Sequence, residues 1–459
     1  MTDFSVKSRS ILDRMASEAM EKAHAPGVSL ALLRDGEIVY RQGYGSKDME
    51  ESLPATPETL YGIGSCTKSF ICLAVMQLVQ DGRLRVTDPI RDHLPLKLGF
   101  GDSPITVHHL MSHSSGIPSL GTANILIERM SLGEGWIPLT SESDFYGFMN
   151  AAGDQVDARP GEKYFYLNAG FTLLGLLVEK VSGLGLEEYL RERVFKPLGM
   201  DRTTLLRERF DSDGDRMTAY WKGPDGKQSA TVHPFHPLIY APGGILSSVV
   251  ELTRYLTMYL QNGEYGGETI LGEDLLKEMY KSHTRRPDNV FGRNAYGYGW
   301  GIMEFMGHEL VVHTGSTGVS AAFQGFIPEL GVGVAYLSNT GYWGSAIPHA
   351  ALALLMGKDP VEDVPYLAQW KHWERLAGTY SSYRGVFKAE VEQKGGMLVG
   401  TAKSRHGDQT VPLIPVSDDP RCNEFWVYGN ETGRMKVWFE LDEGESRLYY
   451  ERWVLRKPL

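Results

Sequence analysis

The sequence predicts an α/β protein: an antiparallel sheet flanked by helices, with a mostly helical subdomain, followed by a small antiparallel β-barrel. Strand-like runs occur near both ends of the first domain, at 27–45 and 298–339. Between them, residues 65–260 have mainly helical patterns. Beyond residue 372, short strand-like runs alternate with turn signals, which is typical of a small barrel. A sheet shared by both ends of a domain around a helical middle is an α/β arrangement.

The first predicted elements are a helix and a hairpin. Residues 5–23 have the apolar spacing of an amphipathic helix, with Ile11, Leu12 and Met15 among the apolar positions. Two apolar strands then flank Asp35-Gly36, a dipeptide that favours a tight hairpin turn. We therefore expect a hairpin over 27–45.

A largely apolar helix follows Ser65. Residues 70–79 are apolar at almost every position, and Asp81-Gly82 provides a C-terminal stop signal. A helix that is apolar on nearly every side lies in the core of its domain. Ser65 is therefore expected to emerge from that core into a cleft.

The chain divides into two predicted domains. Residues 1–360 form the first domain, the polar, proline-containing segment 361–371 forms a linker, and residues 372–459 form the barrel. The strand-like runs of the barrel are 386–392, 397–400, 425–428, 435–439 and 448–450. The barrel mouth could hold a small ligand, but a filled core used in assembly is favoured, because the interiors of small barrels are often filled by side chains.

The tetrapeptide Ser65-Cys66-Thr67-Lys68 is the first motif that suggests chemistry. Residues i and i+3 share a helix face, so the Lys68 ammonium can reach the Ser65 hydroxyl. The helix N-terminus adds unpaired N–H groups around them. This arrangement can activate a serine nucleophile. The alternative is that Ser65 caps the helix and Lys68 is a solvated residue of its first turn.

A second motif is Tyr166-Leu167-Asn168, between a Pro-Gly turn and a helical run. Asn168 is a candidate helix cap. Tyr166 can serve as a general base or proton relay if neighbouring cations lower its pKa. The alternative for Tyr166 is a packed aromatic side chain without a chemical role.

A third motif, His313-Thr314-Gly315-Ser316, ends an apolar strand-like run. Small residues there allow a substrate backbone to lie along the strand edge. The N–H groups of Ser316 and Ser65 could together form an oxyanion hole. Alone, this motif could be a glycine-rich hairpin turn with a half-exposed histidine, but the three motifs in this order favour an active site.

With these motifs, the chain resembles the serine β-lactamase and penicillin-binding-protein superfamily, and within it the class C-like CubicO branch. The Ser-x-x-Lys, Tyr-x-Asn and Lys-Thr-Gly motifs of that superfamily correspond to the three motifs quoted above. The resemblance covers roughly residues 5–355. Further stretches that agree with the branch are 105–116, 241–248 and 337–339. The segment Leu376-Ala377-Gly378-Thr379-Tyr380 is similar to the opening of a lipocalin-like C-terminal domain.

The resemblance implies roles for the motif residues. Ser65 would attack a carbonyl, and Lys68 and Tyr166 would share the transfer of its proton to the leaving group. Asn168 would position Lys68 and bind the substrate amide, and His313 would line the cleft and tune Tyr166. The remaining members would bind substrate or the oxyanion: Thr314, Gly315 and Ser316.

The function implied by these roles is acyl transfer from short peptides, with a preference for D-residues as one option offered by related aminopeptidases. Two alternatives stay open. The first is a carboxylesterase that uses the same residues. The second is a catalytically silent binding or assembly protein, in which the old cleft holds a ligand.

One departure from the superfamily pattern carries information. His313 stands where a lysine is usual, and histidine is largely neutral near pH 7. This disfavours β-lactam and D,D-carboxypeptidase substrates, and favours amides or esters without a free carboxylate.

The composition of the chain limits the classes of partner that the protein is expected to bind. Apolar residues make up 42% of the chain, charged residues 22%, and the net charge of −11 comes without a basic block, so no nucleic-acid partner is expected. The sequence predicts neither a signal peptide nor a membrane span.

Three cysteines without metal or disulfide spacing favour a cytoplasmic protein. No metal or other cofactor is expected, and Asn430-Glu431-Thr432 is interpreted as a surface loop rather than a glycosylation site. A homo-oligomer is implied by the resemblance to archaeal peptidases with this domain pair.

Overall fold

The computed structural model describes residues 4–132, 137–223, 225–341, 344–403, 407–429, 433–442 and 444–458. The chain forms two compact units, Met1–Met356 and Gly357–Leu459. The sequence Asn430-Glu431-Thr432 lies outside the described residues.

The segment predicted as a linker, 361–371, is largely helical and belongs to the second unit. It lies in α13 (Pro360–Asp363) and α14 (Pro365–Leu376), each of which has a proline in its first turn. Proline is favoured there because its fixed φ suits the first turn and its missing N–H would have no helical partner. The Asp359 carboxylate accepts hydrogen bonds from the N–H groups of Val361 and Glu362. The polar, proline-containing segment predicted as a linker is thus two helices, the first of them capped by Asp359.

The first unit is built around a nine-stranded sheet with the order β10-β11-β12-β13-β14-β15-β1-β2-β3 among the described residues. Strand β1 pairs with β15, with Val28 opposite Ser338, so both ends of the unit share one sheet as predicted. The strands are β1 (Gly27–Arg34), β2 (Glu37–Asp48), β3 (Leu53–Pro54), β10 (Thr284–Asn289), β11 (Gly292–Tyr296), β12 (Gly301–Phe305), β13 (His308–Ser316), β14 (Ala321–Ile327) and β15 (Val332–Ser338).

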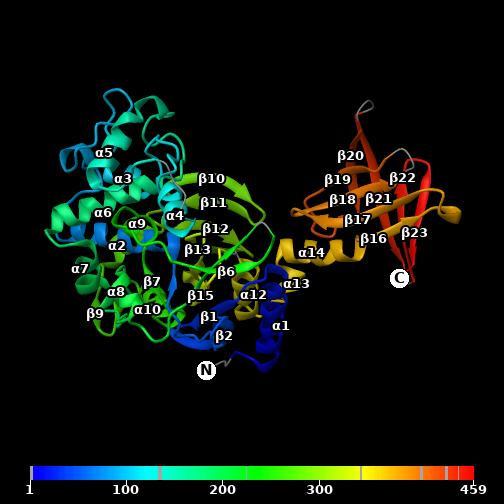
Figure 1. The fold of residues 1–459 in the computed structure, drawn as a ribbon, viewed down its shortest axis with the longest axis horizontal. Coiled ribbons are helices and arrows are strands. Elements are labelled where there is room, and N and C mark those ends of the chain that lie inside the picture. The colour runs from blue at the N-terminus through cyan, green and yellow to red at the C-terminus, as the bar shows by residue number, and fades with distance from the viewer. Residues whose placement is uncertain are drawn as a thin grey trace. The chain divides into compact units, whose positions relative to one another are not determined.

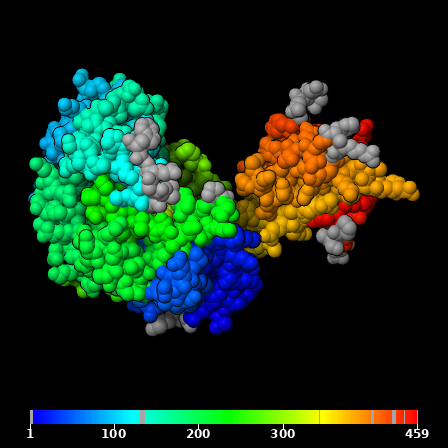
Figure 2. All heavy atoms as spheres, in the orientation of Figure 1, coloured from blue at the N-terminus to red at the C-terminus, as the bar shows by residue number. Residues whose placement is uncertain are grey.

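The predicted N-terminal hairpin is confirmed. Asp35 and Gly36 connect β1 to β2 with φ of 50° and 83°. Two successive positive φ values give a turn whose twist suits a two-residue hairpin, and Asp and Gly tolerate them. In the space-filling view, the N-terminal part of the first unit (blue) adjoins residues from the middle of the chain (green) (Figure 2).

Helices cover the nine-stranded sheet of the first unit (Figure 1). Helices α10 and α12 both pack against β15, and α1 packs on α12. The longer helices are α1 (Val6–Ala23), α2 (Thr67–Gln80), α4 (Thr122–Leu132), α5 (Glu142–Ala151), α6 (Asn168–Ser182), α10 (Val249–Leu260) and α12 (Ala346–Leu355). The shorter ones are α3 (Val107–Met111), α7 (Leu186–Leu190), α8 (Arg207–Asp211), α9 (Pro237–Gly243) and α11 (Glu273–Met279).

Short two-stranded sheets complete the first unit. They pair β4 with β7, β5 with β6 and β8 with β9. Their bounds are β4 (Tyr61–Gly62), β7 (Leu246–Ser247), β5 (Ala219–Lys222), β6 (Gln228–Thr231), β8 (Glu264–Tyr265) and β9 (Glu268–Thr269).

Helix α2 is the central helix of the core, as its composition predicts. Every residue from Thr67 to Leu78 is buried, and the helix stops before Gly82, whose φ is +69°. Phe70 stacks on Tyr255 of α10 with ring centroids 3.7 Å apart. Burial of a large aromatic ring contributes about 1.5–3 kcal/mol to the free energy of unfolding. The helix is thereby fixed from its first turn, which follows Ser65.

The second unit is a closed antiparallel barrel, as predicted. Its strands are β16 (Gly378–Ser381), β17 (Lys388–Lys394), β18 (Met397–Lys403), β19 (Gln409–Pro415), β20 (Glu424–Gly429), β21 (Gly433–Asp442), β22 (Glu445–Tyr450) and β23 (Trp453–Pro458). Inward-facing Phe425, Phe439 and Leu455 form its core together with Trp373 and Leu376 of α14. The barrel and α14 therefore share one apolar core.

Two further features of the fold concern helices that could cross a membrane and the state of the three cysteines. In the described part of the chain, no single helix is long and apolar enough to cross a membrane. One pair of helices bent by 78°, Asn168–Ser182 with Leu186–Phe195, reaches that length and apolar composition when the two helices are taken together. Cys66 and Cys72 are buried free thiols, and Cys422 is a half-buried one.

Candidate active site

Ser65 and Lys68 lie at the start of the central core helix. Ser65 belongs to the short 3₁₀ turn η1 (Gly64–Cys66), and Lys68 lies in the first turn of α2. The Lys68 side chain is fully buried. Its Nζ lies 3.0 Å from Ser65 Oγ, 2.7 Å from Asn168 Oδ1 and 2.6 Å from the Pro242 carbonyl oxygen. Lys68 is therefore not the solvated residue of the alternative interpretation.

Three acceptors surround Lys68 Nζ, and burial favours the uncharged amine among them. Burial lowers the pKa of Lys68 to about 7, because the ammonium loses its hydration. A neutral amine has two N–H bonds, which match the acceptors on Asn168 and Pro242, and one lone pair. That lone pair can then accept the hydrogen of the Ser65 hydroxyl. The geometry is that of a base in contact with its nucleophile.

Tyr166 lies beside the same serine. Burial raises the pKa of Tyr166 far above its usual range, and a hydrogen bond to Ser65 offsets only part of this shift. The condition under which Tyr166 would be the base, a pKa lowered by neighbouring cations, is not met. Asn168, in turn, is the first residue of α6 rather than its cap, which is Leu167.

His313 is a neutral, fully bonded side chain rather than a half-exposed one. Its Nδ1–H donates to the Thr314 carbonyl oxygen at 2.6 Å, which leaves Nε2 to accept from the Tyr296 hydroxyl at 2.9 Å. Burial lowers the pKa of His313 to about 3. The rings of His313 and Tyr166 are 6.4 Å apart. His313 thus lines the site without supplying a positive charge.

Glycines bring η1 and the end of β13 into contact. A Cβ atom on Gly64 would lie 2.5 Å from the Ser316 nitrogen, and one on Gly315 would lie 2.8 Å from the Ser65 nitrogen. Neither distance is tolerated by real side chains, so only glycine permits this approach. The two backbone nitrogens expected to form the oxyanion hole therefore belong to segments in direct contact.

We expect Gly64→Ala to lower the rate of Ser65 acylation by about 100-fold or more, the usual effect of losing one oxyanion donor. The new methyl would push Ser316 away from Ser65, and the residue's φ of +52° would add strain. Stopped-flow acylation measures the effect.

Gly82→Ala is the matched control, because Gly82 also has a positive φ but has open space where the Cβ would be. An unchanged acylation rate in Gly64→Ala would contradict the assigned contact.

His113, from the stretch 105–116 noted above, holds the Tyr166 loop. Its Nδ1 accepts the N–H of Leu167 at 3.1 Å, and its carbonyl oxygen accepts the N–H of Phe165 at 2.8 Å. Its ring centroid is 4.3 Å from that of Tyr166. His113 is buried and has a φ of 56°. It therefore fixes the backbone on both sides of Tyr166.

We expect His113→Leu to lower the free energy of unfolding by about 1–3 kcal/mol, because the Leu167 N–H is left buried without an acceptor. His113→Asn should lose less, since the asparagine Oδ1 can accept the same bond and asparagine tolerates positive φ. Urea denaturation compares the two variants. Equal losses would show that the hydrogen bond is not what stabilises the loop.

A cleft of about 720 Å³ opens beside Ser65. The predicted site residues that line it are Ser65, Tyr166, His313, Thr314 and Ser316, and Gly315 lies behind them against Ile63. Arg286 of β10 also lines the cleft, 5.2 Å from the Tyr164 ring centroid. Arg286 was not predicted as a site residue, because β10 is too polar to be recognised as a strand. The only feature of the sequence that could have pointed to it is the pair of adjacent arginines, Arg285 and Arg286.

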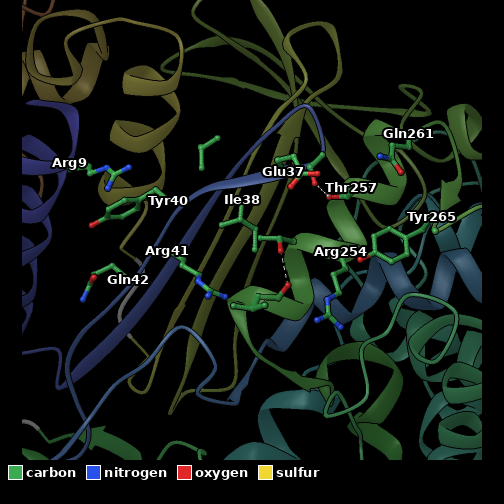
Figure 3. Close-up of a pocket in the computed structure, with 15 residues that line it drawn as sticks. Arg9, Glu37, Ile38, Tyr40, Arg41, Gln42, Arg254, Thr257, Gln261 and Tyr265 are labelled. Carbon is green, nitrogen blue, oxygen red and sulfur yellow. Dashed lines mark hydrogen bonds between the residues drawn. The ribbon is translucent and has the colours of Figure 1, made fainter. Parts of the chain in front are cut away.

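A second hollow, of about 770 Å³, is not a candidate for this chemistry. It lies between β2 and α10, where Figure 3 shows Arg41, Arg254 and Tyr40 around it. Its lining contains none of the three motifs. Among the described residues, no group of three or more His, Cys, Asp or Glu side chains could hold a metal ion.

Comparisons with known proteins agree with this geometry. A family model described as Beta-lactamase matches residues 12–358, and one described as Pab87 octamerisation domain matches residues 360–456. The octameric penicillin-binding protein homologue from Pyrococcus abyssi superposes with a TM-score of 0.90 at 38% identity, over 98% of this chain and 99% of that one.

More distant relatives match in sequence. Protein flp of Staphylococcus aureus (strain MW2) is 26% identical over 339 residues, which is 72% of this chain but only 63% of that protein's length. The unguisins hydrolase ungD' of Aspergillus campestris (strain IBT 28561) is 24% identical over 421 residues, or 87% of this chain and 73% of that protein. With three quarters of its length matched by the family model and its motif residues gathered at one cleft, the chain belongs to the β-lactamase family of serine hydrolases.

Proposed function

We propose that the protein is a peptidase that cleaves short peptides through an acyl-enzyme on Ser65. The observation that carries this proposal is the contact between a buried Lys68 amine and the Ser65 hydroxyl, with both N–H bonds of the neutral amine matched by acceptors. A serine is a weak nucleophile until an adjacent base removes its proton. Lys68 is the base, because its pKa is lowered to about 7 whereas that of Tyr166 is raised.

In acylation, Ser65 Oγ forms a bond to the substrate carbonyl carbon as its proton passes to Lys68 Nζ. The carbonyl electron pair moves to oxygen, where the N–H groups of Ser65 and Ser316 stabilise the negative charge. The C–N bond then breaks and the oxyanion collapses to the acyl-enzyme. The leaving nitrogen needs a proton at this stage.

Tyr166 is the donor that makes amide cleavage feasible. Its hydroxyl stays protonated beside Ser65, so it can give its hydrogen to the leaving nitrogen and take the proton held by Lys68 in exchange. Esters need this protonation less than amides do. In deacylation, neutral Lys68 takes a proton from a water molecule, whose oxygen attacks the acyl carbon. The bond from the acyl carbon to Ser65 Oγ then breaks as Lys68 returns that proton to Ser65 Oγ.

The alternatives are separated by one comparison. Turnover of matched p-nitrophenyl esters and aminoacyl anilides, in D and L forms, is measured on one preparation together with a penicillin. A peptidase cleaves the anilides, whereas a carboxylesterase acylates only with the esters. Absence of any adduct on Ser65, also with a serine-reactive phosphonate, would favour a silent binding protein and refute the proposed reaction.

We further propose a homo-oligomer in a reducing, cytoplasmic setting. Residues 360–456 match the octamerisation-domain model, and the P. abyssi relative is octameric. The free thiols of Cys66 and Cys72 support the compartment. Light scattering after size exclusion should give eight times the 51.1 kDa chain mass, and a monomer would refute the assembly.

A further inference from the structure

Two hollows of different volume meet at Ser65. Ser65 and Ser316 line both the 720 Å³ cleft and a much smaller hollow of about 50 Å³. Tyr166 lines the larger one, and Asn168 lines the smaller one. Because the scissile carbonyl lies beside the nucleophile and the oxyanion donors, the two halves of a substrate enter different hollows.

The position of the proton donor decides which half enters the smaller hollow. Tyr166 gives its hydrogen to the leaving nitrogen, so the leaving group lies on the Tyr166 side of the scissile bond. The acyl group then lies on the opposite side, next to Asn168. The smaller hollow, which we call the acyl hollow, is therefore where the acyl group binds.

The acyl hollow is small and mainly apolar. Among its described lining residues no side chain is charged. The residues that contribute apolar surface are Ala123, Ile127, Pro234, Ile239 and Pro242. A volume of about 50 Å³ has room for roughly two to four groups of the size of a water molecule. The acyl hollow can thus hold a short hydrocarbon chain, and a long chain exceeds it.

Two walls of the acyl hollow are part of the catalytic machinery. The α9 wall contains Pro242, whose carbonyl oxygen lies 2.6 Å from Lys68 Nζ. The β13 wall ends at Ser316, and the turn after it is held by a hydrogen bond of 2.7 Å between the hydroxyls of Thr317 and Ser320. A longer acyl chain that displaced either wall would also move the base or an oxyanion donor.

A further wall is formed by α4, which carries none of the three motifs. Ala123 and Ile127 lie one helical turn apart on α4, and both line the acyl hollow. Ile127 is half-buried, and a Cβ atom on Gly318 would lie 3.4 Å from Ile127 Cγ2, an ordinary van der Waals distance. The Ile127 side chain thus closes the acyl hollow against the turn after β13. It can be changed without altering the base, the nucleophile or the oxyanion donors.

We propose that Ile127 determines the specificity for the acyl group and limits it to short, uncharged chains of about two to four carbon atoms beyond the carbonyl. This inference rests on the proposed acyl transfer at Ser65. In a peptide substrate, the residue that acylates Ser65 then has a small side chain, as in glycine or alanine. Larger side chains, such as those of leucine and phenylalanine, would collide with Ile127.

The test varies the acyl chain and keeps the leaving group constant. Turnover of p-nitrophenyl acetate, butyrate and hexanoate is measured for the wild type, Ile127→Ala and Ile125→Ala. In the wild type, kcat/KM should fall by about 10-fold or more from butyrate to hexanoate, since a single misfitting methylene already costs about 10- to 200-fold. Ile127→Ala should raise the hexanoate-to-butyrate ratio by about 10-fold or more.

Ile125→Ala is the matched control. Ile125 is the same residue type on the same helix and is also half-buried, but it does not line the acyl hollow. Its variant should keep the wild-type ratio. Ala123→Leu makes the opposite change, because the added carbon atoms fill the acyl hollow, and should lower the butyrate-to-acetate ratio by about 10-fold or more. This second variant tests the inference even if Ile127→Ala does not fold.

Covalent labelling provides an independent measurement. Phosphonates that share one leaving group and carry a methyl, propyl or pentyl chain should label Ser65 of the wild type in that order of rate, as followed by intact-protein mass spectrometry. Labelling by pentyl as fast as by methyl, or equal changes in Ile127→Ala and Ile125→Ala, would overturn the inference. If p-nitrophenyl acetate acylates Ser65 and hexanoate does so equally well, the inference fails while the hydrolase stands. If no ester or phosphonate modifies Ser65, the proposed function itself fails.

Discussion

Ser65→Ala should abolish formation of the acyl-enzyme and lower turnover by at least about 10⁴-fold, as expected when a nucleophile that acts together with its base is removed. The hydroxyl is the only group lost, and Lys68 keeps its contacts with Asn168 and Pro242. The fold should therefore survive, with an unchanged circular dichroism spectrum. Intact-protein mass spectrometry after exposure to a slowly hydrolysed p-nitrophenyl ester measures the adduct.

Ser229→Ala is the control for this experiment, because Ser229 is an exposed residue of β6 outside the cleft lining. It should form the same adduct as the wild type. A folded Ser65→Ala protein that still acquires one equivalent of acyl group would refute the assignment of the nucleophile.

Lys68→Met should lower the rate of acylation by at least about 10³-fold, within the range for a base that activates a serine. In the wild type the rate should rise with pH through about 7 and then level off, because only the neutral amine can accept the Ser65 proton. Single-turnover acylation between pH 5 and 9 follows both effects. Lys68→Arg keeps a cation that does not lose its proton in this range, so it should be as inactive as Lys68→Met.

The same lysine should make stability depend on pH. Its pKa is about 7 in the folded state and about 10.4 in an unfolded chain, so between these values the unfolded state binds one more proton. The free energy of unfolding must then rise with pH by about 1.4 kcal/mol per unit in this window. Between pH 7 and 9 the wild type should gain about 2–3 kcal/mol relative to Lys68→Met.

Urea denaturation at the two pH values measures this difference. Parallel pH profiles for wild type and Lys68→Met would mean that Lys68 is charged in the folded protein. The assignment of Lys68 as the base would then be wrong.

The parts of the fold that were predictable are those with local causes. The hairpin follows from Asp35-Gly36, because a two-residue turn of this kind requires positive φ values and these two residues have them. The burial of α2 follows from a run of residues that is apolar on all sides. The contact between Ser65 and Lys68 follows from their spacing in the chain.

Two of the strands that were not predicted, β10 and β19, are polar or interrupted by proline. β10 reads Thr-Arg-Arg-Pro-Asp-Asn and lies at the edge of the sheet, where it needs no apolar face. β19 contains Pro412 and Pro415, although it pairs with both of its neighbours in the barrel. Arg286 was missed as a result, because its place in the cleft depends on a strand that its own sequence does not indicate.

The choice between Lys68 and Tyr166 as the base could not be made from sequence for a related reason. Both pKa shifts arise from burial by distant segments: Pro242 comes from α9, and Tyr296, beside His313, comes from β11. The motif residues were identifiable one by one, whereas their protonation states depend on the assembled core.

The pairing of β1 with β15 also determines when the protein can become active during its synthesis. β1 leaves the ribosome roughly 300 residues before its partner, a delay of about 15–60 s at ordinary rates of translation. Ser65 and Lys68 are made early in this interval, and Ser316 is made near its end. A nascent chain therefore carries its nucleophile long before the strand that completes the oxyanion site, and cannot hydrolyse anything until the sheet has closed.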